Sequence, residues 1–210
     1  MFHVSQEHSP DTPRGKLRHA TRDVHERQHG LDAFRPLLDQ TISHVEYRTL
    51  LESLYGFHQP LEAALLAHAD SQTVPGMTGR RRAHLLVEDL NALRGVGCGV
   101  PANLPRATPP SHLLSRPGGY LGCLYVREGA MLGGRVLAGK LDHLLGSRTE
   151  GRRFFSGGPR DAELWRSCCA AIDQAGHGPA LEGIVAAARA TFELFECWMT
   201  RAETKLGVAN

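Results

Sequence analysis

A histidine at the edge of a predicted apolar helix face is one residue whose type and position could support a chemical reaction. Leu17, Thr21 and Val24 recur at the three- and four-residue spacing of one helix face. His25 directly follows Val24 and can face the interior, where a neutral imidazole can bind a metal ion. An ordinary core or surface histidine is the alternative, since the chain has 12 histidines. His25 and His29 have the spacing of a zinc-binding pair, but no acidic third ligand stands at a suggestive spacing.

Four glycines within one apolar segment are the second unusual feature. The spacing of apolar residues over 122–137 predicts a helix, yet the segment contains Gly122, Gly129, Gly133 and Gly134. Each glycine inside a helix costs about 1 kcal/mol relative to alanine, so four together cost roughly 4 kcal/mol. A cost of that size is a large share of a domain's stability, and some other interaction should offset it.

Three of these glycines share one side of the predicted helix. Gly122, Gly129 and Gly133 project onto nearly the same face at about 100° per residue. Such a stripe lacks side chains, so that the backbone can approach another group closely. Either a second helix packs there through small residues, or a flat ligand lies against the bare backbone. A phosphate-binding loop is excluded, because no strand precedes the glycines and no Gly-Lys-Ser/Thr ending follows them.

Helices are the regular elements that must position these residues. We expect them over residues 16–28, 31–38, 43–69, 78–93, 120–145, 161–172 and 179–206. Gly30 is a natural stop for the first helix, and Pro60 should kink or restart the long third one. No alternating strand and no internal repeat is recognisable. The predicted fold class is therefore all-α, with roughly six to eight helices in one bundle-like domain.

The remaining segments divide into a tail, a loop and the faces of the middle helices. Residues 1–13 are expected to form a disordered tail before a domain of residues 14–206. Residues 94–110 hold glycines and prolines with little periodicity, and they predict a loop, which we interpret as an ordinary crossover rather than a lid. The apolar positions of the third and fourth helices are Val45, Tyr47, Leu50, Leu51, Leu54, Tyr55, Phe57, Leu85, Leu86, Leu90 and Leu93.

Composition narrows the classes of function. With 41% hydrophobic and 22% charged residues, the 210-residue chain is globular in character. A net charge of +2 and 6% aromatic residues give no argument for nucleic-acid binding. No apolar run is long enough for a membrane span, and the first residues lack the apolar stretch of a signal peptide. Five cysteines without a Cys-x-x-Cys pair favour reduced thiols, and we expect a cytoplasmic protein.

Four segments, in order along the chain, carry a resemblance to one family. The segment 17–25, which ends in His25, resembles the first-helix motif of haem oxygenases, in which the histidine is the iron ligand. The segment 125–134 is similar to the glycine-rich distal helix of that family. The segments 154–166 and 190–198 are similar to the branch associated with bacterial phytochromes. The resemblance covers about residues 14 to 200 and gives the histidine and the glycines a common cause.

The resemblance implies a haem oxygenase-like bundle that opens haem to biliverdin, carbon monoxide and ferrous iron. Haem is then both substrate and cofactor, with O2 as the oxidant and electrons from an external reductase or ferredoxin. His25 is the implied iron ligand, and the backbone at Gly129 and Gly133 is implied to crowd the opposite side and to steer oxygen toward a ring carbon. A bacteriophytochrome is a possible acceptor of the biliverdin, and the alpha isomer is then expected.

The same resemblance extends to the rim of the pocket. Cationic anchors are expected for the two propionates, and Arg18 and Arg166 stand near basic positions of the family. Tyr125 would add a hydroxyl near the haem edge, and Phe192 would form an apolar wall. Thr21 and Gly134 belong to the two matching motifs and complete the residues assigned to the haem site. For both arginines a solvated helix face is the alternative, and for Phe192 it is core packing.

Two positions depart from the family pattern. His29 stands where many members have a carboxylate that is bonded to the iron ligand, so a carbonyl, water or His29 would take that role. Ala130 stands where animal-type members have an aspartate that organises water. Glu128 and Arg135 could replace it only if they point inward.

Two other classes of protein remain compatible with the sequence. The first is a haem carrier without enzymatic activity, which would also need His25. The second is a protein of the same fold that binds another flat ligand, such as a thiamin or quinone precursor. The run Arg80-Arg81-Arg82 could dock an acidic electron donor, although a solvated helix start is the more ordinary interpretation.

Overall fold

Helices form all of the regular secondary structure in the part of the chain that the structure describes, which comprises residues 11–68, 77–93 and 100–206 of a computed structural model. In order these are α1 (Pro13–Ala20), α2 (Arg22–Gln28), the 3₁₀ turn η1 (Asp32–Phe34), α3 (Arg35–Leu38), α4 (His44–Ala67), α5 (Met77–Arg80), α6 (Ala83–Ala92), α7 (Ser111–Leu114), α8 (Gly119–Gly139), α9 (Asp142–Leu145), α10 (Arg153–Ser156), α11 (Asp161–Ala175) and α12 (Pro179–Leu206). The all-α prediction is confirmed.

The first helix begins earlier than the sequence predicted. The Thr12 side chain accepts a hydrogen bond from the Gly15 amide at 3.1 Å, and Pro13 occupies the first helical turn. Pro13 is favourable there because a helix leaves its first amides without partners anyway. The end of the predicted tail of residues 1–13 is thus part of α1, whereas residues 1–10 lie outside the described residues.

Three helices that were predicted as continuous are each divided. The helix predicted over 16–28 breaks at Thr21, whose φ of −110° and ψ of 4° leave the helical region. The helix predicted over 78–93 breaks at Arg81 and Arg82, and the one predicted over 120–145 breaks after Gly139. The short helices α7 and α10 were not predicted. The bundle therefore has more, shorter segments than the six to eight that periodicity indicated.

The long helix α4 passes through Pro60 without a restart. A proline has no amide hydrogen, so the Gly56 carbonyl four residues earlier cannot receive its helical hydrogen bond. The Ala107 amide of the 100–110 loop donates to this carbonyl at 2.9 Å instead. A Cβ on Gly56 would come within 2.6 Å of the Pro105 carbonyl oxygen, so glycine lets the loop approach closely. Of the predicted kink or restart, the restart does not occur, because a distant segment satisfies the carbonyl that Pro60 leaves free.

The apolar face of the middle helices is mostly as predicted. Ser43 and Glu46 form a capping box that fixes the start of α4. Val45, predicted as part of the apolar face, is 63% exposed in the first turn of that helix. Leu85 is half-buried, whereas Leu86 and its partners on α6 reach the core.

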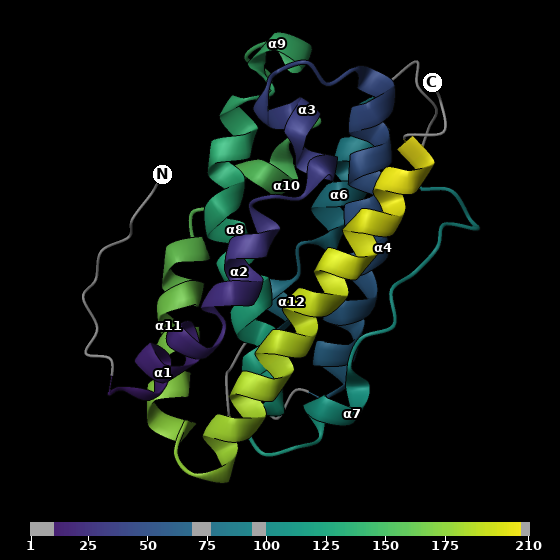
Figure 1. Ribbon diagram of the computed structural model, residues 1–210. Helices are drawn as coiled ribbons and strands as arrows, with labels where there is room; N and C mark the ends of the chain where they lie inside the picture. The colour runs from purple at the N-terminus through teal and green to yellow at the C-terminus, as the bar shows by residue number, and fades with distance from the viewer. Residues whose placement is uncertain (1–10, 69–76, 94–99, 207–210) are drawn as a thin grey trace.

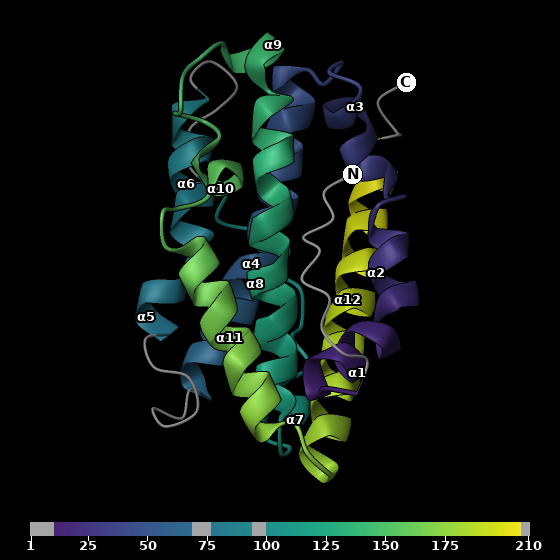
Figure 2. The ribbon, with the colours of Figure 1, turned by 90° about the vertical axis from the view of Figure 1, so that its left-hand side faces the viewer.

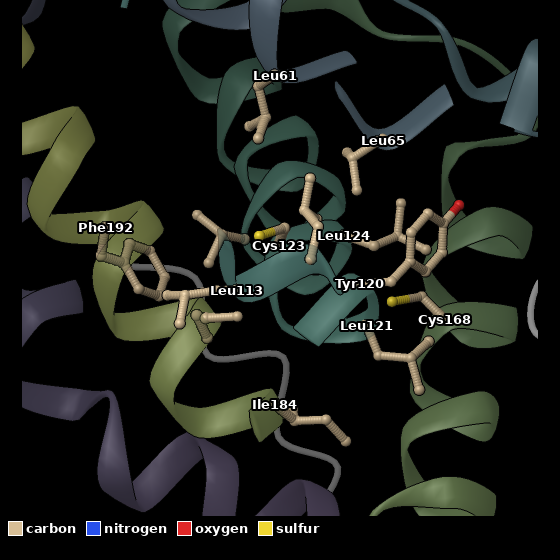
Figure 3. Close-up of a cluster of buried hydrophobic side chains, with 14 of the residues drawn as sticks. Leu61, Leu65, Leu113, Tyr120, Leu121, Cys123, Leu124, Cys168, Ile184 and Phe192 are labelled. Atoms are coloured by element: carbon tan, nitrogen blue, oxygen red, sulfur yellow. The ribbon is translucent and has the colours of Figure 1, made fainter. Parts of the chain in front are cut away.

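The helix α8 runs through the middle of the bundle and packs against α12, α11, α10 and α4 (Figures 1 and 2). Its N-terminal half contributes to one apolar cluster, part of which is drawn in Figure 3, where Cys123 and Leu124 lie between Phe192 of α12 and Cys168 of α11. Its C-terminal half contributes Met131 and Ala138 to a second cluster. The helix that carries the glycines is thus held on several sides.

Candidate functional site

The glycines of α8 have different surroundings although they share one face of the helix. A Cβ on Gly122 would lie 2.2 Å from the Ile184 carbonyl oxygen of α12, so this glycine lets the two helices cross closely. A Cβ on Gly129 would meet the Trp165 ring at 3.5 Å, whereas a Cβ on Gly133 would have nothing within 4 Å. Each of the two interpretations left open by the sequence therefore describes one part of the glycine stripe. The stripe packs against a helix at Gly122, and it is bare at Gly133.

We call the bare surface of α8 at Gly129, Gly133 and Val136 the open face. Gly133 is exposed, and Val136 is 42% exposed. The helices α2 and α8 both pack on α12, and in Figure 2 α8 and α2 stand apart with α12 beside α2. Phe192 of α12 belongs to the same apolar cluster as residues of both helices. The helix α12 thus packs against both the helix with the open face and the helix that carries the candidate ligand.

His25 is exposed on α2 and has two aromatic neighbours. Its ring lies edge-on to Phe192 at 5.8 Å and to His29 at 5.0 Å between ring centroids. The pKa of His25 is lowered because neighbouring atoms remove part of its hydration, and the charges of His29 and Arg18 add to this effect, whereas Glu26 opposes it. The imidazole is therefore neutral at pH 7, which is the state that binds a metal ion.

Arg18 and Tyr125 are two further residues expected at the site. Arg18 is exposed on α1, and its charge contributes to the lowered pKa of His25 and opposes the rise in the pKa of Tyr125. Burial raises the pKa of Tyr125 to about 12, and its ring packs against Trp165 at 5.2 Å. Trp165 is a residue that sequence reasoning missed as part of the site. It lies within the quoted 154–166 motif, and this was the signal that could have identified it.

Two of the residues expected at the site, Thr21 and Gly134, have other contacts, and a third, Arg166, lies at the surface. The Thr21 hydroxyl is buried and donates to the Leu17 carbonyl at 2.9 Å, so it acts at the junction of α1 and α2. Gly134 is buried against α10, where a Cβ would lie 3.0 Å from the Phe155 carbonyl oxygen. Arg166 is exposed on α11, next to Trp165. Gly134 follows Gly133 by one residue, so it points about 100° away from the open face.

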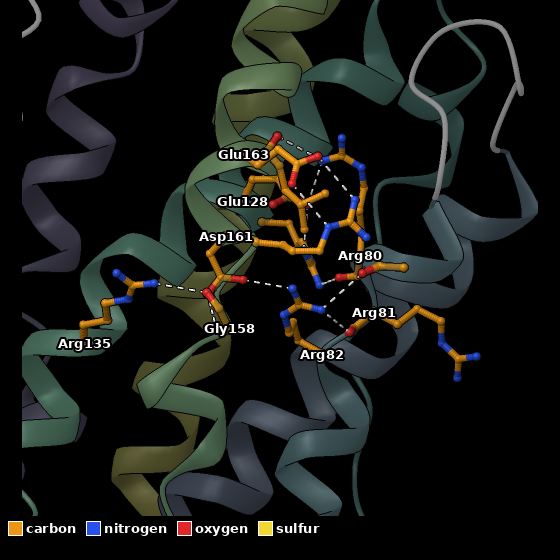
Figure 4. Close-up of polar contacts among 12 residues, drawn as sticks. Arg80, Arg81, Arg82, Glu128, Arg135, Gly158, Asp161 and Glu163 are labelled. Atoms are coloured by element: carbon orange, nitrogen blue, oxygen red, sulfur yellow. Dashed lines mark hydrogen bonds and ion pairs between the residues drawn. The ribbon is translucent and has the colours of Figure 1, made fainter.

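Neither candidate for organising water points toward the open face. Arg135 is exposed and donates to the Gly158 carbonyl at 3.1 Å (Figure 4). Glu128 is 2% exposed and pairs with Arg127 at 2.8 Å and with Arg80 at 3.2 Å. At about 100° per residue, Glu128 lies about 100° around the helix from Gly129, and Arg135 lies about 160° from Gly133. Ala130 is exposed beside Gly129, at the edge of the open face.

Glu128 is part of a buried group that we call the ion quartet, formed by Arg80, Arg127, Glu62 and Glu128. Arg127 donates to Glu62 at 2.9 Å and also to the Arg80 carbonyl. Glu62 accepts hydrogen bonds from the Arg82 and Ala83 amides at 2.8 and 3.1 Å, and thereby caps the start of α6. The quartet joins α4, α5 and α6 to α8 on the side opposite to the glycines.

The run Arg80-Arg81-Arg82 is not a basic docking patch. Arg80 is 1% exposed, and Arg82 pairs with Asp161 at 2.9 Å (Figure 4). Only Arg81 of the three is exposed. Both interpretations from the sequence, a docking patch and a solvated helix start, are wrong for Arg80. The acidic partners come from distant segments, which charge patterning along the chain cannot reveal.

Some sites can be excluded within the described residues. No group of three or more His, Cys, Asp and Glu side chains that could hold a metal ion is found there. Across residues 11–68, 77–93 and 100–206, no helix has the length and hydropathy of a membrane span. Two hollows of about 300 and 220 Å³ lie around Arg116, near the N-terminal end of α8 and away from Gly129 and Gly133.

Comparison with known proteins gives one family. The heme oxygenase family model matches residues 14–201. No curated protein matches significantly in sequence. The fold is similar to a heme oxygenase from Neisseria meningitidis solved with NO and CO bound, with 19% identity over 91% of this chain and 92% of that one and a TM-score of 0.70.

Two cyanobacterial structures are also similar. Heme oxygenase-1 of Synechocystis sp. PCC 6803, solved with heme, is 17% identical over 94% of this chain and 95% of that one, with a TM-score of 0.70. Heme oxygenase-2 of the same organism, solved with heme and NO, is 22% identical over 94% of this chain and 88% of that one, with a TM-score of 0.69. At these identities the likeness is one of fold.

Proposed function

The chain belongs to the haem oxygenase family and is a haem-degrading oxidoreductase, and we propose that it binds haem between α2 and the open face of α8 and opens the ring to biliverdin there. The observation that carries the proposal is the pairing of a neutral, accessible imidazole on one helix with bare backbone on another. A flat haem needs a wall without side chains, and its iron needs a neutral imidazole to bind it.

When bound, haem supplies both the ring that is cleaved and the iron at which O2 is activated. His25 holds the iron from the α2 side. Its lowered pKa keeps the imidazole free of the proton that would compete with the metal. Phe192 and His29, both in ring contact with His25, limit the directions in which the imidazole can turn.

The opposite wall of the proposed site is a helix surface without side chains. At Gly133 there is room for a ring because no side chain projects and nothing lies within 4 Å of where a Cβ would stand. Gly129 keeps the Trp165 ring edge next to the backbone. The bare backbone at Gly129 and Gly133 would let a bound ring lie close to α8, and it would limit the space beside the ring.

The rim of the site carries the charges. Haem has two propionates, and we assign Arg18, which is exposed on the helix that precedes α2, as the partner of one. Arg166 is the candidate for the second, beside Trp165. The Tyr125 hydroxyl keeps its proton at all physiological pH values, so it can donate a hydrogen bond at the haem edge. Thr21 and Gly134 serve the site through the α1–α2 junction and the contact with α10.

The finer assignments follow from the motif resemblance. O2 is the oxidant, electrons come from a separate ferredoxin or reductase, and carbon monoxide and ferrous iron leave with biliverdin. The motifs at 154–166 and 190–198 support membership of the phytochrome-associated branch, with a bacteriophytochrome as acceptor and cleavage at the alpha position. The free thiols of Cys123, Cys168, Cys169 and Cys197 fit the reducing cytoplasm.

The experiment that tests the proposal is a titration with haemin followed by turnover. Purified protein should give a one-to-one Soret band that decays to a biliverdin spectrum, with carbon monoxide released, after ferredoxin and its reductase are added. The His25→Ala variant should lose the imidazole-ligand spectrum and turnover, while His84→Ala, a change to an exposed histidine on α6, should keep both.

Two outcomes would contradict the proposal. A stable Soret band without decay would identify a haem carrier, and normal turnover by His25→Ala would remove the ligand assignment.

A further inference from the structure

The helix α2 has little apolar attachment to the bundle. It is seven residues long, and Val24 is its buried residue. The break at Thr21 separates it from α1, so the axis of α1 does not determine how α2 is turned. A short helix of this kind needs other interactions to hold its orientation.

A group of charges joins one flank of α2 to α12, and we call it the ion strip. Arg189 donates to both carboxylate oxygens of Asp23, at 2.7 and 2.9 Å, in a two-bond fork. Arg27 Nε lies 2.9 and 3.0 Å from the two oxygens of Glu196. Arg27 also lies 3.6 Å from Asp23, and Arg189 lies 3.9 Å from Glu193. The five residues form one connected set.

The ion strip and the candidate ligand lie on opposite flanks of the same helix. At about 100° per residue, Asp23 and Arg27 share one flank of α2, and Val24 follows toward the core. His25 comes about 200° after Asp23, on the other flank. Besides Val24, the Gln28 side chain donates to the Phe192 carbonyl at 3.4 Å, and the His25 ring contacts Phe192. These contacts lie on the side of α2 away from Asp23 and Arg27, so the ion strip is what holds the other flank against a roll.

We propose that the ion strip positions His25 by fixing the roll of α2 on α12. A helix with its side chains has a radius of about 5 to 6 Å, so a roll of roughly 20° moves the tip of a side chain by about 2 Å. Displacement on that scale is enough to spoil an axial ligand bond and the chemistry that depends on it. The inference rests on the proposed function only in taking His25 as the iron ligand.

The geometry distinguishes this group from ordinary surface ion pairs. Single exposed pairs contribute little, but two-bond arginine–carboxylate geometry and connected charges are the exceptions. Arg189 also donates to the Ala20 carbonyl at 2.5 Å, which ties the strip to the end of α1. Because the strip is accessible to solvent, salt should screen it.

The first experiment is hydrogen exchange on the haem-free protein at low and at high salt. Amides of residues 22–28 should exchange roughly threefold faster in Asp23→Asn and in Arg189→Gln, and the double variant should be no faster than either. High salt should produce the same acceleration in the wild type and little more in the variants. Glu163→Gln, which removes an exposed pair with Arg160 on α11, is the matched control and should leave residues 22–28 unchanged. Equal exchange in the wild type and in all four variants would overturn the proposal.

The second experiment reads the ligand itself in the haemin complex. Asp23→Asn and Arg189→Gln should shift the iron–imidazole vibration and add a population without imidazole ligation, while unfolding midpoints stay near that of the Glu163→Gln control. An unchanged iron–imidazole signal despite faster exchange would overturn the positioning role. Failure of the proposed function looks different, because the wild type would then give the same spectrum as His25→Ala before any change to the strip.

Discussion

The two helices that border the open face are held in place by different interactions. The helix α8 has 21 residues, twelve of them buried, and its ion pairs lie in the buried quartet. The helix α2 has seven residues, one of them buried, and its ion pairs are accessible to solvent. Buried charges interact strongly and are costly to separate, whereas exposed charges are weakened by water and salt.

This difference separates two requirements of a site that takes in a flat ligand. A wall of bare backbone works only if it does not move, and burial on several sides of α8 provides that. The helix α2, which carries His25, is held instead by ion pairs that are accessible to solvent, so its orientation should depend on salt.

The largest effect is expected from the ion quartet. Replacing Arg127 with Met leaves Glu62 and Glu128 buried without this partner, and should lower the free energy of unfolding by about 3 to 5 kcal/mol. Denaturant unfolding measures the change. Arg81→Met, the same substitution at an exposed neighbour of Arg80, should change it by less than about 0.5 kcal/mol. Similar losses in the two variants would remove the quartet as the attachment of α8.

A pH effect should follow from the buried His58 beside Arg127. Burial, with the charge of Arg127, lowers the pKa of His58 from 6.5 to about 3. Below pH 6.5 the His58 imidazole binds a proton in the unfolded chain but not in the folded chain. The free energy of unfolding therefore decreases by about 1.4 kcal/mol for each pH unit below 6.5. The protonation of His58 in the unfolded chain therefore lowers the stability by about 2 kcal/mol at pH 5. Asp23 stays ionised at that pH, because Arg189 lowers its pKa to about 2.

Denaturant unfolding between pH 7 and pH 4 measures this slope. The His58→Leu variant should show a slope that is shallower by one proton, and His84→Leu, which changes an exposed histidine, should keep the wild-type slope. A slope that is the same in all three proteins would contradict the prediction.

A matched pair of substitutions tests the division of the glycine stripe. Gly122→Ala should cost about 1 to 3 kcal/mol, because its Cβ would lie 2.2 Å from the Ile184 carbonyl oxygen and the helices would have to separate. Gly133→Ala should instead stabilise the haem-free protein by about 0.5 to 1 kcal/mol. The same Gly133 change should weaken haemin binding. Changes of equal sign in stability would show that the stripe is uniform.

The smallest effect is expected at the rim. Arg18→Ala should weaken haemin binding by roughly threefold to tenfold, with no change in unfolding, because Arg18 is exposed. Lys16→Ala removes an exposed charge from the same helix and serves as the control. Equal haemin affinities of the two variants and the wild type would show that Arg18 belongs to an ordinary solvated helix face.

Periodicity predicted the long helices well, because it follows from local burial. The bounds predicted for α12 agree with the structure, and the capping box at Ser43 marks the start of α4. The break at Thr21 was not predictable, since a threonine that bonds to its own preceding turn is compatible with either outcome.

The candidate site could be predicted only as far as the residues on each helix. Gly122 and Gly133 have the same position on the helix, and only the crossing of α8 and α12 makes one packed and the other bare. The burial of Arg80 depends on partners from two other segments, α8 and α11, and no single segment of sequence contains that information.

The hydrogen bond between the Gly56 carbonyl and the Ala107 amide has a consequence for how related sequences can differ. Pro60 makes the carbonyl available, and the 100–110 loop has to keep its length and course to reach it. A relative with another residue at this position closes the bond within its own helix and is free to lengthen or shorten the loop. Proline in α4 and loop length should therefore be inherited together across homologous chains.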